Sequence, residues 1–359
     1  MKHIHIPKHI HPHLHRHKDR KPAVEQQLLA AGAQVHGENY TYTIVKVLGK
    51  GAYGVTYLAT THVKLTGDLG TIETEVQITL KEFYMQGRMS REGDIVNRNT
   101  EDTETNSFAR CFYMEADKIA SLSHPNIVKV LEVFVDNNTC YYAMEYLSGG
   151  SLLDLIDRNK GIREPEAQEY IRQIGSALSY MHHHKMLHLD VKPSNVMLSS
   201  DGIPKLIDYG LSQQYGNDGE LESDDGLGSG TPGYAPLEQS AQQNIQYFSP
   251  TLDVYALGAT YYRMLTGVTP SNAVDILNKG VNTLPLVQKN VSQQSIDAIK
   301  AAMQPTVDRR LQSIDEFLNM LQPGSASDPS GSDDGFALWF RFLLILAAIV
   351  AVIIALLLL

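Results

Sequence analysis

The spacing of hydrophobic and polar residues divides the chain into a strand-rich part and a helical part. Up to Tyr84, β-branched and aromatic residues alternate with polar ones, a period of two that predicts strands. Later segments such as Glu166–His184 repeat apolar residues every three or four positions, which predicts helices. No internal repeat interrupts residues 40–321. We therefore expect one α+β domain over this range, a small β-rich portion followed by a larger helical one.

The end of the sequence is a separate apolar run. Residues 336–359 carry a single charge, Arg341, and the 18 residues from Phe342 onward carry none. A helix of that length extends about 27 Å, close to the hydrocarbon thickness of a bilayer, about 30 Å. Residues 322–335, rich in Gly, Ser, Asp and Pro, predict a flexible linker before it. We expect a single transmembrane helix in contact with membrane lipid, and a buried core helix is the alternative.

The first 39 residues differ in composition from the rest. Residues 1–22 hold seven of the 14 histidines and a local charge of +5, and they contain no apolar core that would indicate a secretory signal. We expect residues 1–39 to be a basic tail without regular structure. Weak binding of transition metals and an origin as a purification tag are the alternatives.

Charge and cysteine content narrow the class of protein. The net charge of −10 argues against a protein that coats nucleic acid, so we expect no nucleic-acid partner. The only two cysteines, Cys111 and Cys140, predict no disulfide framework and favour a reducing compartment.

The stretch "LGKGAYGVTYLA" has the glycine spacing GxGxxG at Gly49, Gly51 and Gly54. A Rossmann turn has the same spacing but opens a helix, whereas the residues that follow here alternate as a strand does. We therefore expect a glycine-rich hairpin that lies close over the phosphates of a nucleotide. Its candidate ATP-binding residues are Leu48, Gly49, Lys50, Gly51, Ala52, Tyr53, Gly54, Val55 and Thr56.

An apolar strand, Val76–Tyr84, carries a lone cation at Lys81. We expect Lys81 to form an ion pair with Glu115, which lies on a predicted helix, and to hold the α- and β-phosphates of ATP. The two residues are separated by residues 87–106, a polar segment that we expect to be a mobile insertion. Thr79 is expected to face the adenine.

The stretch "MLHLDVKPSNVML" combines groups suited to phosphoryl transfer. Asp190 can orient and accept the proton of a hydroxyl, and Lys192 can stabilise the transferred group. Asn195 and Asp208, the latter after the strand "PKLI", offer hard oxygen ligands for Mg²⁺.

Taken in order, these motifs resemble the protein kinase family, and their wording is most similar to bacterial serine/threonine kinases of the eukaryotic type. The resemblance covers residues 40–321 and implies a bilobal fold with ATP and Mg²⁺ as cofactors and protein substrates. It implies that Met144 is the gatekeeper and that the backbone of Glu145 and Leu147 binds adenine. In "DVKPSN", Lys192 resembles the serine/threonine-specific loop, and Thr231 agrees with it.

The resemblance also implies structural roles and one departure. Glu238 would pair with Arg310, and Asp253 would brace the catalytic loop, where His188 has a packing role. The family usually has Arg at the position of Leu189. Because leucine has no charge or donor for a phosphate, we expect activity that does not need phosphorylation of the acidic segment 216–230.

We therefore expect an active, membrane-anchored serine/threonine kinase with its catalytic domain in the cytoplasm, where ATP is available. A pseudokinase scaffold that binds partners at the membrane is the alternative, and a small-molecule kinase is a distant third. All six groups with chemical roles are present, which favours activity: Lys81, Glu115, Asp190, Lys192, Asn195 and Asp208. The sequence does not indicate the oligomeric state.

Overall fold

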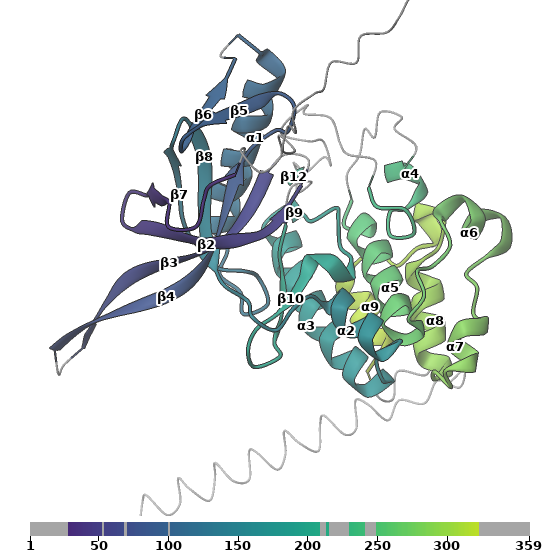
Figure 1. Ribbon diagram of the computed structural model, residues 1–359. Helices are drawn as coiled ribbons and strands as arrows, with labels where there is room; N and C mark the ends of the chain where they lie inside the picture. The colour runs from purple at the N-terminus through teal and green to yellow at the C-terminus, as the bar shows by residue number, and fades with distance from the viewer. Residues whose placement is uncertain are drawn as a thin grey trace, which may run out of the picture.

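The computed structural model describes residues 28–51, 54–67, 70–99, 101–208, 213–214, 230–240 and 249–322. Two lobes are visible in Figure 1, a β-rich N-lobe and a helical C-lobe, as the hydrophobic pattern predicted. The predicted transmembrane helix, residues 336–359, lies outside the described residues, as does most of the N-terminal tail. Within the described part, no helix combines the length and apolar character needed to cross a bilayer.

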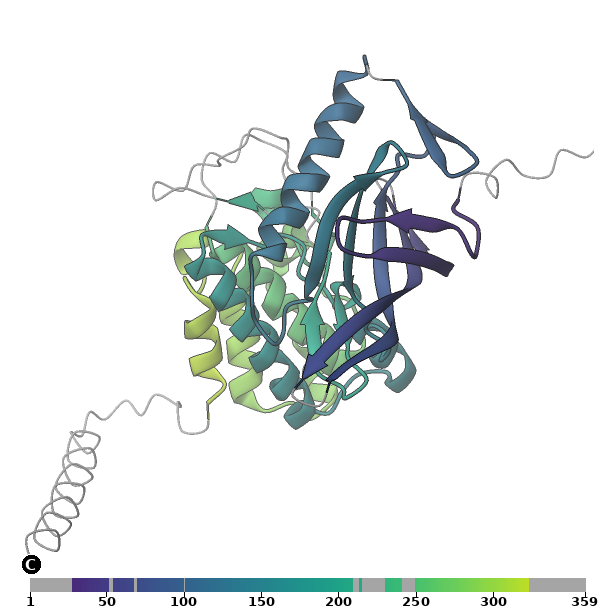
Figure 2. The same cartoon turned by 90° about the vertical axis from the view of Figure 1, so that its left-hand side faces the viewer.

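The N-lobe is built on a six-stranded antiparallel sheet in the order β1-β2-β3-β4-β8-β7. Its strands are β1 (Gln34–His36), β2 (Thr41–Lys50), β3 (Gly54–Gly67), β4 (Gly70–Phe83), β7 (Val130–Asp136) and β8 (Thr139–Glu145). Helix α1 (Thr103–Ala120) lies along one face of this sheet, as Figure 2 shows. Strands β3 and β4 continue past the sheet as a long two-stranded arm (Figure 1).

The N-lobe begins earlier than the sequence predicted. Residues 34–36 are an edge strand paired with residues 41–43, and the Val35 side chain is fully buried. Leu29 is also buried in the core. The boundary at residue 40 was therefore wrong, because a short segment without strong alternation still gains burial by pairing with an existing sheet edge.

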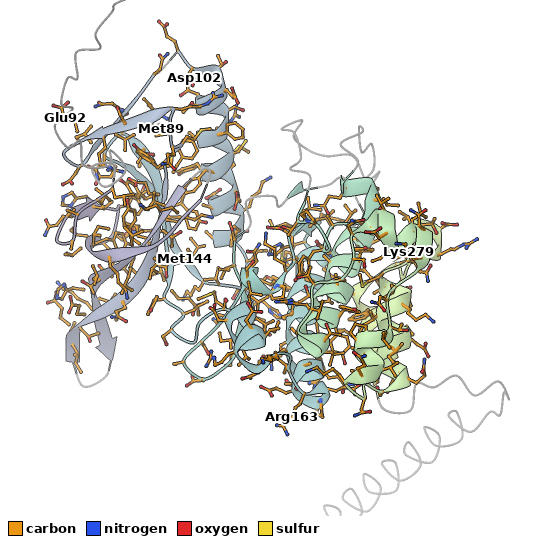
Figure 3. All side chains as sticks on the ribbon, turned by 45° about the vertical axis from the view of Figure 1, so that its right-hand side comes forward. Met89, Glu92, Asp102, Met144, Arg163 and Lys279 are labelled. Carbon is orange, nitrogen blue, oxygen red and sulfur yellow. The ribbon has the colours of Figure 1, made fainter. Side chains whose placement is uncertain are left out.

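The polar segment after β4, which we expected to be a mobile insertion, contains regular secondary structure in its described residues. It forms a hairpin of β5 (Met89–Glu92) and β6 (Ile95–Arg98), with Met89 buried at 3% exposure. Arg91 forms a fully buried ion pair with Glu82, 2.6 Å between Nη2 and Oε1. Figure 3 places Met89 and Glu92 with Asp102, the N-cap of α1, in the part of the N-lobe away from the C-lobe.

The C-lobe is organised around α5 (Thr251–Thr266), of which every residue except Arg263 is buried. A helix that is buried all round must be covered by other elements. Helices α3 (Glu164–His183), α7 (Leu284–Gln288), α8 (Gln293–Ala302) and α9 (Ile314–Met320) pack against it. Helices α2 (Leu152–Asn159) and α6 (Ala273–Lys279) complete the lobe. The short helix α4 (Leu237–Ser240) precedes α5, and a 3-10 helix η3 spans Val307–Arg309.

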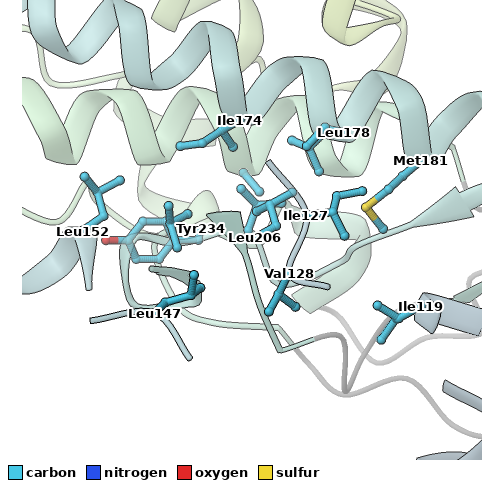
Figure 4. Packing of buried hydrophobic residues seen from close by; sticks show 14 of the residues in the cluster. Ile119, Ile127, Val128, Leu147, Leu152, Ile174, Leu178, Met181, Leu206 and Tyr234 are labelled. Carbon is cyan, nitrogen blue, oxygen red and sulfur yellow. The ribbon is translucent and has the colours of Figure 1, made fainter. Parts of the chain in front are cut away.

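Short strands carry the loops that face the N-lobe. Strand β10 (Val196–Leu198) pairs with β11 (Pro204–Leu206), and β9 (Met186–Leu187) pairs with β12 (Gln213–Gln214). A 3-10 helix η2 spans Pro193–Asn195. Figure 4 shows Ile174, Leu178 and Met181 of α3 facing the apolar side chains beneath these strands. Because this core is closely packed, it fixes the positions of the loops that these strands carry.

Candidate active site

A cavity of about 380 Å³ opens where the two lobes meet. It is lined by Leu48, Gly49, Thr56, Thr79, Lys81, Val128, Tyr142, Met144, Glu145, Tyr146, Leu147, Ser194, Met197, Ile207 and Asp208. Met144 lies at the junction of the lobes in Figure 3. Eight of these residues were predicted from the sequence as site residues, and Thr79 was predicted to face the adenine. Nothing in the sequence indicated that Tyr142 or the apolar side chains of Val128, Met197 and Ile207 line the cavity.

The glycine-rich stretch joins two antiparallel strands, as predicted. Gly49 pairs with Thr56 and Lys50 with Val55, and the Gly51 N–H donates to the Gly54 carbonyl at 2.8 Å. Val55 is buried and lines no part of the cavity, because alternate residues of a strand face opposite sides. Ala52 and Tyr53, at the tip, lie outside the described residues.

Gly54 needs to be a glycine for a reason of packing. A Cβ at this position would lie 2.7 Å from the Glu82 carbonyl oxygen. Strands β3 and β4 therefore approach each other more closely here than a side chain allows. This close approach places the base of the hairpin directly beside the strand that carries Lys81.

Lys81 pairs with Asp208 instead of Glu115. Its Nζ lies 2.8 Å from Asp208 Oδ1, and it sits 5.5 Å from the centroid of the Tyr142 ring, within cation–π range. Burial acts to lower the pKa of Lys81, but Tyr142, Asp208 and Glu115 together hold it well above its usual value. The positive charge of Lys81 in turn keeps the pKa of Asp208 below its usual range.

Glu115 faces the same site without a hydrogen bond. Its Oε1 is buried and has no partner among the described residues. Burial raises the pKa of Glu115 to about 7, and the nearby Lys81 opposes this rise. The predicted ion pair between Lys81 and Glu115 is thus absent from this structure, because the Lys81 ammonium pairs with Asp208.

Asp190 is held by a dense set of hydrogen bonds. Lys192 Nζ donates to Asp190 Oδ2 at 2.6 Å, and the Thr231 hydroxyl donates to Oδ1 at 2.7 Å. Lys192 also contacts Thr231 Oγ1 at 2.7 Å. Asn195 Nδ2 donates to both Asp190 Oδ2 and the Asp190 carbonyl, at 2.8 and 3.0 Å. Both oxygens of the carboxylate are therefore oriented before any substrate binds.

The oxygen donors of Asn195 and Asp208 fit Mg²⁺. The amide nitrogen of Asn195 is bound to Asp190, which turns its Oδ1 away as the remaining donor atom. Mg²⁺ in phosphoryl-transfer sites takes one or two protein oxygens and completes its shell with phosphate and water. Among the described residues no group of three or more His, Cys, Asp or Glu gathers as a metal site.

Asp253 on α5 supports the catalytic loop, as the resemblance implied. Its carboxylate accepts the backbone N–H groups of His188 at 2.9 Å and Leu189 at 2.8 Å. It also contacts His182 Nε2 at 2.8 Å. Burial alone would raise the pKa of Asp253. The hydrogen bond from His182 and the charges of the His182 and His188 rings have the larger effect, so the pKa lies below its usual value. His182 lies in the last turn of α3, and its contact with Asp253 was not predicted from the sequence.

The segment before α5 is tied down by a predicted ion pair. Arg310, with no exposed side-chain surface, places Nη1 2.6 Å and Nη2 3.3 Å from the two oxygens of Glu238. Such a two-point contact fixes direction as well as distance. It anchors α4, and with it the segment that contains Thr231.

A glycine-rich hairpin over a cleft, a lysine–aspartate pair inside it and an oriented aspartate beside them define a phosphotransferase of the two-lobed kinase type. Residues 88–321 match the protein kinase domain family, and the chain belongs to that family.

Relatives with known names agree with this family. The chain is 26% identical over 288 residues to the serine/threonine-protein kinase cds1 of Schizosaccharomyces pombe, covering 77% of this chain and 57% of that protein. It is 34% identical over 233 residues to the probable serine/threonine-protein kinase MARK-C of Dictyostelium discoideum, covering 64% and 26%. It is 28% identical over 258 residues to the human NUAK family SNF1-like kinase 2, covering 72% and 36%.

A solved structure shares the fold. The crystal structure of Rad53 residues 1–466 in complex with AMP-PNP superposes with a TM-score of 0.57 at 22% identity, covering 78% of this chain and 64% of that one. The chain spans less than two thirds of the length of these relatives, so their further segments have no counterpart in the matched region.

Proposed function

We propose that this chain is an active kinase that transfers the γ-phosphate of ATP to serine and threonine hydroxyls of proteins. The observation that carries the proposal is the geometry of Asp190, whose two carboxylate oxygens are held by Lys192, Thr231 and Asn195 in one network. A pseudokinase scaffold has no need for an oriented carboxylate next to an ammonium in a nucleotide-sized cleft.

The site residues have different roles in phosphoryl transfer. Asp190 orients the substrate hydroxyl and accepts its proton, while Lys192, 2.6 Å from that carboxylate, supplies positive charge beside the transferred group. Lys81 would hold the phosphates beneath the glycine-rich hairpin. Mg²⁺, held by Asn195 and Asp208, would neutralise phosphate charge. Glu115 adds a second negative charge to the surroundings of Lys81 beside that of Asp208.

The acidic segment 216–230 and the residues that follow it to Gln239 correspond to the activation segment of protein kinases. We propose further that phosphorylation of this segment does not switch the kinase on. Leu189 is 3% exposed and has no side-chain donor, so a phosphate on the segment would find no cation at this position. The acidic stretch 216–229 lies outside the described residues, and its composition would repel a further negative charge. We also propose that the chain belongs with the bacterial serine/threonine kinases of the eukaryotic type, because its motifs resemble theirs most.

We propose that residues 336–359 anchor the kinase in a membrane with the catalytic domain in the cytoplasm. The support is the length and apolar character of the sequence. Membrane fractions washed with carbonate or high salt should retain the full chain and release residues 1–335. Release of the full chain by either wash would contradict a spanning helix.

The central experiment compares phosphate transfer from radiolabelled ATP to a protein substrate by the full chain in detergent and by Asp190→Asn. We expect transfer by the wild type and its loss in the variant, and equal labelling would favour the pseudokinase. A second assay measures the initial rate before and after treatment with a phosphatase that is then removed. A large fall in rate, reversed by autophosphorylation, would contradict independence from activation-segment phosphorylation.

A further inference from the structure

The catalytic loop contains a residue in an unfavourable backbone conformation. Leu189, directly before Asp190, has a φ of 65°, in the left-handed region that non-glycine residues avoid. For such a residue the left-handed conformation costs about 1–2 kcal/mol. The side chain of Leu189 is buried at 3% exposure, so it packs well but provides no polar anchor for the backbone. Something else must hold this peptide in place.

Both backbone groups of Leu189 are held from different elements. Its N–H donates to Asp253 on α5 at 2.8 Å. Its carbonyl accepts a hydrogen bond from Gln239 Nε2 on α4 at 2.7 Å. The carbonyl of Leu189 belongs to the same planar peptide unit as the N–H of Asp190. The hydrogen bond from Gln239 therefore fixes the orientation of the peptide unit that leads into Asp190.

The Gln239 amide is itself fixed in place. It is 3% exposed and directly follows Glu238, which the buried Arg310 holds. The chain passes close against it at Gly230, where a Cβ would lie 3.1 Å from Gln239 Nε2 and 2.5 Å from the Ala235 Cβ. Gly230 has a φ of 65° and precedes Thr231, whose hydroxyl donates to Asp190. The amide thus lies between the end of the activation segment and the catalytic loop.

We propose that Gln239 is a positioning residue for phosphoryl transfer. Its uncharged hydrogen bond joins the end of the activation segment to the peptide that precedes Asp190, and it does so without a phosphate. The inference rests on the proposed kinase activity and deepens the proposed independence from phosphorylation, because it names the bond that orders the loop instead. Nucleotide binding should not depend on this bond, because Gln239 does not line the cavity.

The test uses two variants that conserve side-chain volume in the full chain. Gln239→Met removes the donor and keeps the shape, while Gln239→Glu places a carboxylate oxygen against the Leu189 carbonyl. We expect kcat to fall about tenfold in Gln239→Met, because the buried Leu189 carbonyl loses its hydrogen-bond donor. The fall should be larger in Gln239→Glu, because its carboxylate oxygen repels that carbonyl. The KM for ATP should stay within about twofold of the wild type. If the loss came from altered packing alone, kcat would fall equally in Gln239→Met and Gln239→Glu.

Gln294→Met is the matched control. Gln294 also donates to backbone carbonyls of the C-lobe, those of Met320 at 2.8 Å and Gln322 at 2.7 Å, far from the catalytic loop in sequence. Its kcat should equal that of the wild type. Thermal melting of every variant verifies that the rates refer to folded protein.

Three results would overturn the role of Gln239: a kcat of Gln239→Met within twofold of the wild type, an equal fall in Gln294→Met, or a KM for ATP that rises in proportion to the loss. All rates are measured with and without phosphatase treatment. A collapse of the wild-type rate after phosphatase would overturn phosphorylation independence alone. The comparison between Gln239 variants in the untreated enzyme would still decide the positioning role.

Discussion

Neutralising Glu115 should stabilise the protein and impair it as an enzyme. In this structure Glu115 Oε1 is buried without a partner, and burial raises its pKa from 4.5 to about 7. Between these two pH values the folded protein holds a proton that the unfolded chain has released. The free energy of unfolding therefore falls as the pH rises from about 4.5 to about 7, and the whole penalty is present above that range.

The size of the effect follows from the shift. A rise of about 2.5 pKa units corresponds to about 3 kcal/mol at 1.36 kcal/mol per unit. Glu115→Gln keeps the shape and cannot ionise, so at pH 8 its free energy of unfolding should exceed that of the wild type by up to this amount. The difference should shrink toward zero as the pH falls to about 4.5. Catalysis should fall, because the Glu115 carboxylate is one of the groups that hold the positive charge of Lys81 in the cleft, and glutamine carries no charge.

Urea unfolding of the full chain, followed by circular dichroism at intervals from pH 5 to pH 8.5, measures the difference. Asp117→Asn, an exposed position on the same helix, is the control and should show no such pH-dependent gain. If Glu115→Gln is less stable than the wild type at pH 8, the carboxylate is already paired in solution and the reasoning fails. A kcat equal to that of the wild type would refute a role of Glu115 in holding the charge of Lys81.

Three further predictions concern the N-lobe. Lys81→Met should lower kcat by orders of magnitude while circular dichroism shows an unchanged fold, and a wild-type rate of phosphate transfer would contradict the assignment of the nucleotide site. Arg91→Met should cost about 3–5 kcal/mol of stability in thermal or urea unfolding, because it leaves the Glu82 carboxylate buried with no cation. The double variant Arg91→Met/Glu82→Gln should recover part of that loss, and additive losses would refute the pairing. Tyr142→Leu should reduce kcat/KM for ATP about tenfold through loss of the ring beneath Lys81, whereas Tyr142→Phe, which keeps the ring, should stay near the wild type. Equal losses in the two variants would place the effect in the hydroxyl.

Local patterns were sufficient to predict the hairpin and the loops that follow it. Alternation after Gly54 predicted strand instead of helix, and β3 begins there. The pairing of Glu238 with Arg310 and the contact of Asp253 with the catalytic loop followed from the family resemblance, and both are present. The boundary at residue 40 failed because β1 depends on a sheet edge formed by residues further along the chain.

The amino-acid sequence by itself determined the fold class and the residue types that chemistry requires, since strand and helix periods and glycine spacing are local properties of the chain. Only the tertiary structure decided which groups meet. Lys81 lies next to Asp208, distant in sequence, and Glu115 Oε1 is left buried without a partner among the described residues. The reason is physical: pairing and pKa depend on distance and burial, which arise only when separate elements pack around the same cleft.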